Sequence, residues 1–141
     1  DLLGPDWDAG EVVRRMRTHP EMTIGEAILD QRIVAGAGNV YKSEVCFLRG
    51  VDPATPVEAV DDLEGLVDLL HRLLFVNRER GDQVTTGDTR PGRARWVYGR
   101  GAQPCRRCGS RIVRTVEPGY GGERVTYRCP ACQPATADRS R

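Results

Sequence analysis

Apolar residues recur at helical spacing in four stretches of the first 77 residues, with polar residues between them. These stretches predict helices over residues 7–18, 23–31, 39–48 and about 61–77. Asp6 or Asp8 is placed to cap the first helix, and Thr23 with Glu26 forms a capping box at the start of the second. The leucine-rich stripe of the last helix is wide enough to line a core. We therefore expect a small helical bundle.

A glycine-rich turn separates the second and third predicted helices. Gly36 and Gly38 indicate a backbone that turns sharply through positive φ, and Asn39 follows where a new helix would be N-capped. The N–H groups and partial positive charge of such a helix N-terminus suit a phosphate, which Asn39, Tyr41 and Lys42 can flank. The alternative is an ordinary helical hairpin whose glycines only close the turn, and the local pattern leaves both interpretations open.

The helical pattern ends near residue 77, and residues 78–100 form a predicted basic loop or linker. A loop of this length without periodicity is typically functional or disordered. Arginines alternate here with aromatic residues, as in a strip that faces nucleic acid; they are Arg90, Arg93, Arg95 and Arg100, with Trp96 and Tyr98. The alternative is a solvated connector, which applies most strongly to residues 85–92.

Two closely spaced cysteine pairs give the clearest chemical signal in the chain. Cys105 and Cys108 are followed after twenty residues by Cys129 and Cys132. Four thiolates around one ion are typical of a structural Zn²⁺ site with closed coordination. Between the pairs, residues 110–116 and 124–128 alternate like two strands, and residues 117–122 are turn formers. We predict a zinc-finger hairpin over residues 101–133 with Arg124 just past its tip, followed by a disordered tail over 134–141.

Charge is distributed unevenly along the 141 residues. Residues 1–77 carry 7 basic and 14 acidic residues, whereas residues 78–141 carry 14 basic and 6 acidic residues. The basic second half suggests a polyanionic partner, although two halves of opposite charge can also attract one another.

There is no run of 18 apolar residues and no signal peptide, so we expect no membrane partner. Paired cysteines argue for a metal in a reducing compartment, and Cys46 reads as a small buried thiol.

These observations predict an α plus small β fold. A four-helix domain over residues 1–77 would contain the helix, double turn and helix, and the basic linker would lead to the four-cysteine finger. The finger is too small for a core of its own, so one bound Zn²⁺ would supply its folding energy.

The two motifs, in this order, resemble the C-terminal half of the formamidopyrimidine-DNA glycosylase and endonuclease VIII family. The matching segments are Leu29-Asp30-Gln31, Gly36-Ala37-Gly38-Asn39-Val40-Tyr41, Glu44, Tyr98-Gly99-Arg100, Thr126-Tyr127 and all four paired cysteines. The overall pattern is similar to an endonuclease VIII-like member. The resemblance implies a helix–two-turn–helix fold with a zinc finger. It also implies that the parent protein is a base-excision-repair enzyme, a DNA glycosylase and AP lyase acting on oxidised bases in double-stranded DNA.

The resemblance assigns roles to individual residues. Asn39 matches the family's asparagine that contacts phosphates beside the lesion, and Arg124 matches the finger arginine that grips phosphates and supports the final elimination. Together with the anion site and the basic strip, the expected DNA-binding set is Gly38, Asn39, Tyr41, Lys42, Arg95 and Arg124. Residues 83–95 occupy the place of a loop that covers the extruded base in some members. Gly25 departs from the pattern, because some relatives have a lysine there; that contact is either lost or supplied by a nearby arginine.

The family's nucleophile is an N-terminal proline followed by glutamate, and Asp1-Leu2 does not match it. The expectation is therefore a DNA-clamping fragment that is inactive alone, monomeric, and dependent on an N-terminal catalytic domain of the same protein. It would act in the bacterial cytoplasm, at the nucleoid. A second hypothesis is a stand-alone zinc ribbon that binds protein or RNA, which would leave residues 36–44 unexplained.

Overall fold

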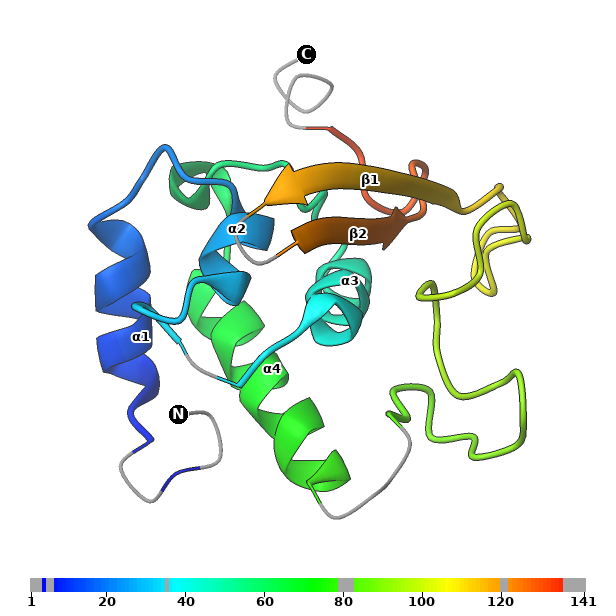
Figure 1. Ribbon diagram of the computed structural model, residues 1–141, viewed down its shortest axis with the longest axis horizontal. Coiled ribbons are helices and arrows are strands. Elements are labelled where there is room, and N and C mark those ends of the chain that lie inside the picture. The colour runs from blue at the N-terminus through cyan, green and yellow to red at the C-terminus, as the bar shows by residue number, and fades with distance from the viewer. Residues whose placement is uncertain (1–3, 5–6, 35, 79–82, 120–121, 136–141) are drawn as a thin grey trace.

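The computed structural model describes residue 4 and residues 7–34, 36–78, 83–119 and 122–135. In chain order the elements are α1 (Ala9–Arg17), α2 (Ile24–Leu29), α3 (Asn39–Leu48), a 3-10 turn η1 (Val57–Ala59), α4 (Leu63–Asn77), β1 (Val113–Gly119) and β2 (Gly122–Arg128). The hairpin of β1 and β2 lies over α3, and α1 and α4 lie on the other side of α2 and α3 (Figure 1). The predicted α plus small β fold is confirmed.

Capping side chains begin three of the helices where the sequence predicted helix starts. Asp8 accepts a hydrogen bond from the Glu11 amide, and Asp62 accepts one from the Gly65 amide. Thr23 caps α2 as expected, because its hydroxyl oxygen accepts a hydrogen bond from the Glu26 amide. In a standard capping box the Glu26 carboxylate would accept from the Thr23 amide. Here it accepts from the Thr23 hydroxyl instead, at 3.0 Å. The first two helices are shorter than predicted, because their end residues form caps and turns. Asp6, the other cap candidate, lies outside the described residues.

Two apolar clusters meet on α3. The larger cluster packs α1, α2 and α4 against one side of α3, where Val45 and Cys46 are fully buried. The smaller cluster joins Phe47 of α3 to Val97, Ile112 and two cysteines of the second half of the chain. Seven of the ten residues of α3 are buried in this way, so this helix is the shared wall of both clusters. The prediction of a buried Cys46 thiol is confirmed, and burial raises the pKa of that thiol to about 12.

The hairpin is longer at its tip than the alternation suggested. β1 and β2 pair in antiparallel register, with Thr115 opposite Thr126 and Glu117 opposite Arg124. The pairing continues to Gly119 and Gly122, so residues predicted as the turn belong partly to the strands. Residues 120–121 lie outside the described part of the chain, as do 136–141, where the tail was predicted.

A buried carboxylate on α3 organises the chain that follows α4. Glu44 is fully buried and accepts hydrogen bonds from the amides of Trp96, Val97 and Tyr98 at 2.6, 2.8 and 3.2 Å, and from the Thr85 hydroxyl. These four donors satisfy a charge that would otherwise be costly to bury.

Two further polar side chains tie the hairpin region to α3 and the loop after it. The Ser43 hydroxyl accepts a hydrogen bond from the Tyr127 amide at 3.1 Å. Gln133 is fully buried and accepts from the Cys129 amide at 2.8 Å, while its own amide donates to the Val51 carbonyl at 2.9 Å. The finger is therefore attached to the helices by hydrogen bonds as well as by apolar packing.

The described part of the linker, residues 83–100, has no helix or strand but is internally bonded. The amides of Thr85 and Thr86 both donate to the Ala94 carbonyl, which closes the loop between them. Asn77, at the end of α4, is buried and exchanges hydrogen bonds with Val84 through its side chain. These bonds hold the two ends of the described segment, whereas residues 89–93 between them are exposed.

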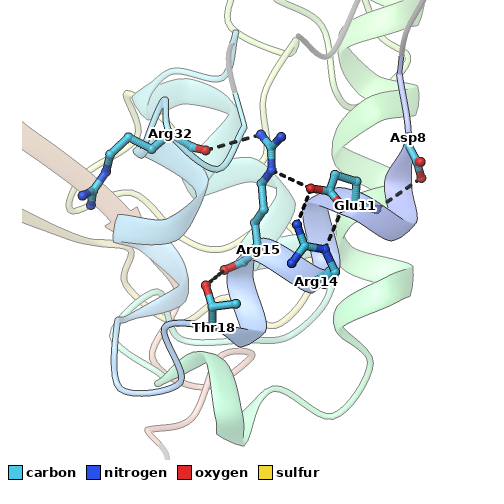
Figure 2. A network of polar contacts seen from close by, with 6 residues as sticks. All are labelled: Asp8, Glu11, Arg14, Arg15, Thr18 and Arg32. Carbon is cyan, nitrogen blue, oxygen red and sulfur yellow. Dashed lines mark hydrogen bonds and ion pairs between the residues drawn. The ribbon is translucent and has the colours of Figure 1, made fainter.

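A surface network braces the double turn from α1 (Figure 2). Glu11 bonds both Arg14 and Arg15, and these contacts lower the pKa of its carboxyl to about 2. Arg15 also reaches the Arg32 carbonyl at 3.4 Å, in the turn that precedes α3 (Figure 2). In the described residues, no helix is both long and apolar enough to cross a membrane.

We predict that Glu44→Ala lowers the free energy of unfolding by about 3 kcal/mol or more, because it leaves buried backbone N–H groups without an acceptor. Urea denaturation measures the change. Glu58→Ala is the matched control, since Glu58 is exposed, and it should leave the midpoint nearly unchanged. Equal stability of the two variants would contradict the role assigned to Glu44.

Candidate nucleic-acid interface and metal centre

The N-terminus of α3 differs from the predicted one by a single residue. Gly38 is the N-cap, in an extended conformation with φ −124° and ψ −176°, and Asn39 is the first residue of the helix. The reason is that the Gly38 carbonyl already accepts the amide of Lys42 at 3.0 Å. The predicted positive φ is found at Gly36, with φ 109°, and is wrong for Gly38. Asn39 therefore does not cap the helix, and its side chain is available for another contact.

The first turn of α3 receives no capping side chain from Gly38. The other three α-helices in the described ranges each have an Asp or Thr that accepts from a first-turn amide. Gly38 is exposed, so the positive end of the α3 dipole begins at the surface of the molecule.

Lys42 is almost completely buried, with 3% of its surface exposed. Its Nζ donates to Asn39 Oδ1 at 2.9 Å. Burial lowers the pKa of the Lys42 ammonium to about 8, because the charged form loses hydration. The Arg124 guanidinium lowers this pKa too, whereas the Glu117 carboxylate raises it.

Lys42 and Arg124 line one hollow of about 270 Å³ between the start of α2, α3 and the hairpin. Gly25 forms part of its wall. A Cβ atom there would lie 3.1 Å from the Pro53 carbonyl oxygen and 3.5 Å from Lys42 Cδ. The stem of Lys42 therefore passes close to Gly25, and the cation beside this glycine comes from α3.

Arg124 extends from β2, where it is half-buried and faces Glu117 across the hairpin. The sequence placed it just past the tip, and the structure brings it to the same hollow as Lys42, more than eighty residues away in the chain. Two members of the expected DNA-binding set, Lys42 and Arg124, thus line one hollow, and a third, Asn39, contacts Lys42.

The remaining members of that set are placed differently. Tyr41 is 4% exposed and packs in the larger apolar cluster, so its ring is part of the core. Arg95 does not line the hollow; its Nε donates to the Gln83 carbonyl at 3.3 Å and its guanidinium lies 5.8 Å from the centre of the Tyr98 ring.

The four paired cysteines converge as the spacing predicted. Their Sγ atoms all lie within 4.8 Å of one another, with 3.9 Å between Cys105 and Cys132 and 3.5 Å between Cys108 and Cys129. A tetrahedral ion with bonds of about 2.3 Å requires sulfur separations of about 3.8 Å, which these distances match. Amides of Arg107 and Cys132 donate to Cys105 and Cys129 sulfurs at 3.4 Å, as partners that orient thiolate ligands. The group can hold one metal ion.

Several residues with defined contacts were not predicted from the sequence. Arg106 donates to the Gly92 and Arg95 carbonyls. The Arg107 guanidinium lies 4.8 Å from the Phe47 ring centre and 4.9 Å from that of Trp96. Both arginines fasten the finger to the linker or to α3. No local pattern carries this information, because each partner is distant in the sequence.

The sequence pattern of the formamidopyrimidine-DNA glycosylase H2TH domain matches residues 3–78. The DNA-(apurinic or apyrimidinic site) lyase Nei2 of Mycolicibacterium smegmatis is 47% identical over 136 residues, covering 96% of this chain and 52% of the relative. The formamidopyrimidine-DNA glycosylase of Pseudomonas aeruginosa is 33% identical over 144 residues, covering 93% and 52%. The chain spans about half the length of these relatives.

A solved structure agrees with the sequence matches. The crystal structure of Lactococcus lactis Fpg in complex with an abasic site containing DNA has a TM-score of 0.74 and 26% identity, covering 96% of this chain and 50% of that one. Because the domain match extends over more than half of the 141 residues, a stand-alone zinc ribbon is not favoured. The Endonuclease 8 2 of Mycobacterium bovis is 50% identical over 133 residues, covering 94% of this chain and 51% of the relative. The chain belongs to the formamidopyrimidine-DNA glycosylase family, of which it carries the H2TH domain, and it is more similar to the relatives named Nei2 and Endonuclease 8 2 than to the glycosylase that names the family.

Proposed function

We propose that this chain is the DNA-gripping region of a base-excision-repair DNA glycosylase and AP lyase that acts on oxidised bases in double-stranded DNA. The observation that carries the proposal is that Asn39, in the first turn of α3, contacts Lys42, and that Lys42 lines the same hollow as Arg124. The amide N–H groups at the exposed start of α3 and the half-buried Arg124 guanidinium suit the phosphates of a DNA backbone. The names of the relatives, an AP lyase and a formamidopyrimidine-DNA glycosylase, support this partner.

The reaction itself is assigned to sequence outside these 141 residues. The relatives are about twice as long as this chain, and we place the family's proline nucleophile in the part of their length that this chain does not match. Arg124 would assist the elimination step by holding the phosphates around an extruded nucleotide. Extrusion costs a few kcal/mol, and phosphate contacts on both sides of the lesion offset that cost.

We further propose that the four cysteines bind one structural Zn²⁺. Four sulfur ligands leave no position for water or substrate, so the ion would stabilise the finger and take no part in the reaction. We also propose that the protein is a monomer. Its helical part, residues 1–77, and its finger, residues 101–133, would bind the same duplex. The bacterial relatives support action at the nucleoid in the cytoplasm.

Arg124→Ala should weaken binding to a duplex with a central abasic-site analogue by about tenfold, equivalent to about 1.4 kcal/mol, because one charged phosphate contact is lost. The slope of log affinity against log salt concentration should fall by about 1. Fluorescence anisotropy across a salt series measures both. Arg72→Ala is the matched control, because Arg72 is exposed on α4 and pairs with Asp68. Equal affinities and slopes for the two variants would rule out Arg124 as a phosphate contact.

Cys129→Ser should abolish stoichiometric zinc binding and unfold the finger, since metal binding supplies the folding energy of so small a unit. Zinc content per chain after dialysis measures the first effect, and near-ultraviolet circular dichroism the second. Cys46→Ala is the control, because Cys46 lies in the core away from the cluster, and it should retain one zinc. A Cys129→Ser protein with one tightly held zinc would contradict the four-thiolate site.

A further inference from the structure

We infer that Lys42 is a positioning residue that fixes the orientation of the Asn39 carboxamide, so that the Asn39 N–H groups face the DNA phosphate. The inference rests on the proposed DNA binding and assigns Lys42 a different role within it. Its basis is the contact of 2.9 Å between Lys42 Nζ and Asn39 Oδ1 within one turn of α3.

The chemistry of the contact determines the orientation of the amide. A lysine ammonium has three donors and no acceptor, so only the oxygen of a carboxamide can face it. The Asn39 nitrogen must then point the other way. Within the described ranges it donates to no other residue, and Asn39 itself is half-exposed beside exposed Gly38. Two N–H donors are thereby presented to the surface at the positive end of the helix.

The position of Lys42 is itself fixed by packing. Its side chain is buried, and its Cδ would lie 3.5 Å, an ordinary packing distance, from a Cβ atom placed at Gly25. A buried ammonium needs an acceptor, and Asn39 Oδ1 is the one hydrogen-bond acceptor found for it among the described residues. Without this cation, the carboxamide could rotate by half a turn at little cost, and its oxygen would then repel a phosphate.

Burial of Lys42, more than the charged groups around the hollow, sets the pH range of this effect. Arg124 and Arg128 of β2 and Glu117 of β1 face it from the hairpin, Glu26 from α2 and Asp52 from the loop after α3. Cys46, on α3 itself, stays a neutral thiol because its pKa is raised to about 12. The pKa of Lys42 is lowered to about 8, so its proton is lost as pH rises through that value. A neutral amine can also accept a hydrogen bond, and it no longer enforces one orientation of Asn39.

A double-mutant cycle tests the inference, with affinity measured on a duplex with a central abasic-site analogue. Lys42→Met keeps an apolar stem and removes the donor, and Asn39→Ala removes the amide. We expect each variant to bind about tenfold more weakly than the wild type, and the double variant to bind no more weakly than Asn39→Ala alone. Arg124→Ala combined with Asn39→Ala should instead multiply the two single effects, because Arg124 acts from β2.

The outcomes separate this inference from the function on which it rests. No binding by the wild-type chain would contradict the proposed DNA binding. Wild-type binding with multiplicative losses from Lys42→Met and Asn39→Ala would leave that function intact and overturn the positioning role.

A second measurement does not depend on the folding of any variant. In the wild-type chain, the side-chain NH₂ signals of Asn39 in nitrogen–proton correlation spectra should shift with a midpoint near pH 8, the pKa of Lys42. Signals that are constant across pH values on both sides of this midpoint would overturn the inference. Folding of the Lys42→Met protein is checked by its urea midpoint before its affinity is interpreted.

Discussion

The structure depends on a single buried carboxylate. Glu44 lies on the helix shared by both apolar clusters and binds three consecutive amides of the linker, fifty residues further along the chain. A buried carboxylate with these donors is stable only in this arrangement, because loss of the contacts would leave both the charge and the amides unsatisfied. The second half of the chain is thereby fixed in one position on α3.

The same helix carries the groups proposed to hold DNA. Asn39 and Lys42 belong to its first turns, and Ser43, adjacent to Glu44, bonds the strand that bears Arg124. The distance between the cation of the helix and the cation of the hairpin is therefore set by buried contacts rather than by a flexible connection. A fixed separation between two cations suits binding to a DNA backbone, because its phosphates are regularly spaced. The unequal charge of the two halves is consistent with this division of roles.

Local signals in the sequence predicted much of the fold. The cysteine spacing located the four-cysteine cluster, the capping residues Asp8 and Thr23 located two helix starts, and the glycines located the turn before α3. Periodicity reports only on apolar burial, so the buried polar residues Lys42 and Glu44 gave no signal of their partners. The sequence predicted that the cationic contact at Gly25 is either lost or supplied by a nearby arginine. The structure instead places the Lys42 side chain beside Gly25. Some of these contacts join elements that are far apart in the sequence. Others depend on which atom of an amide faces a charge. The spacing of residues in the sequence encodes neither.

The most direct test of the account is a nuclear magnetic resonance titration of the chain with a short duplex that contains a central abasic-site analogue. The account predicts that chemical-shift changes concentrate at Gly38, Asn39 and Arg124, with few changes on the exposed faces of α1 and α4. Changes confined to α1 and α4, or no changes at protein concentrations suited to the experiment, would contradict the assignment of this surface to DNA.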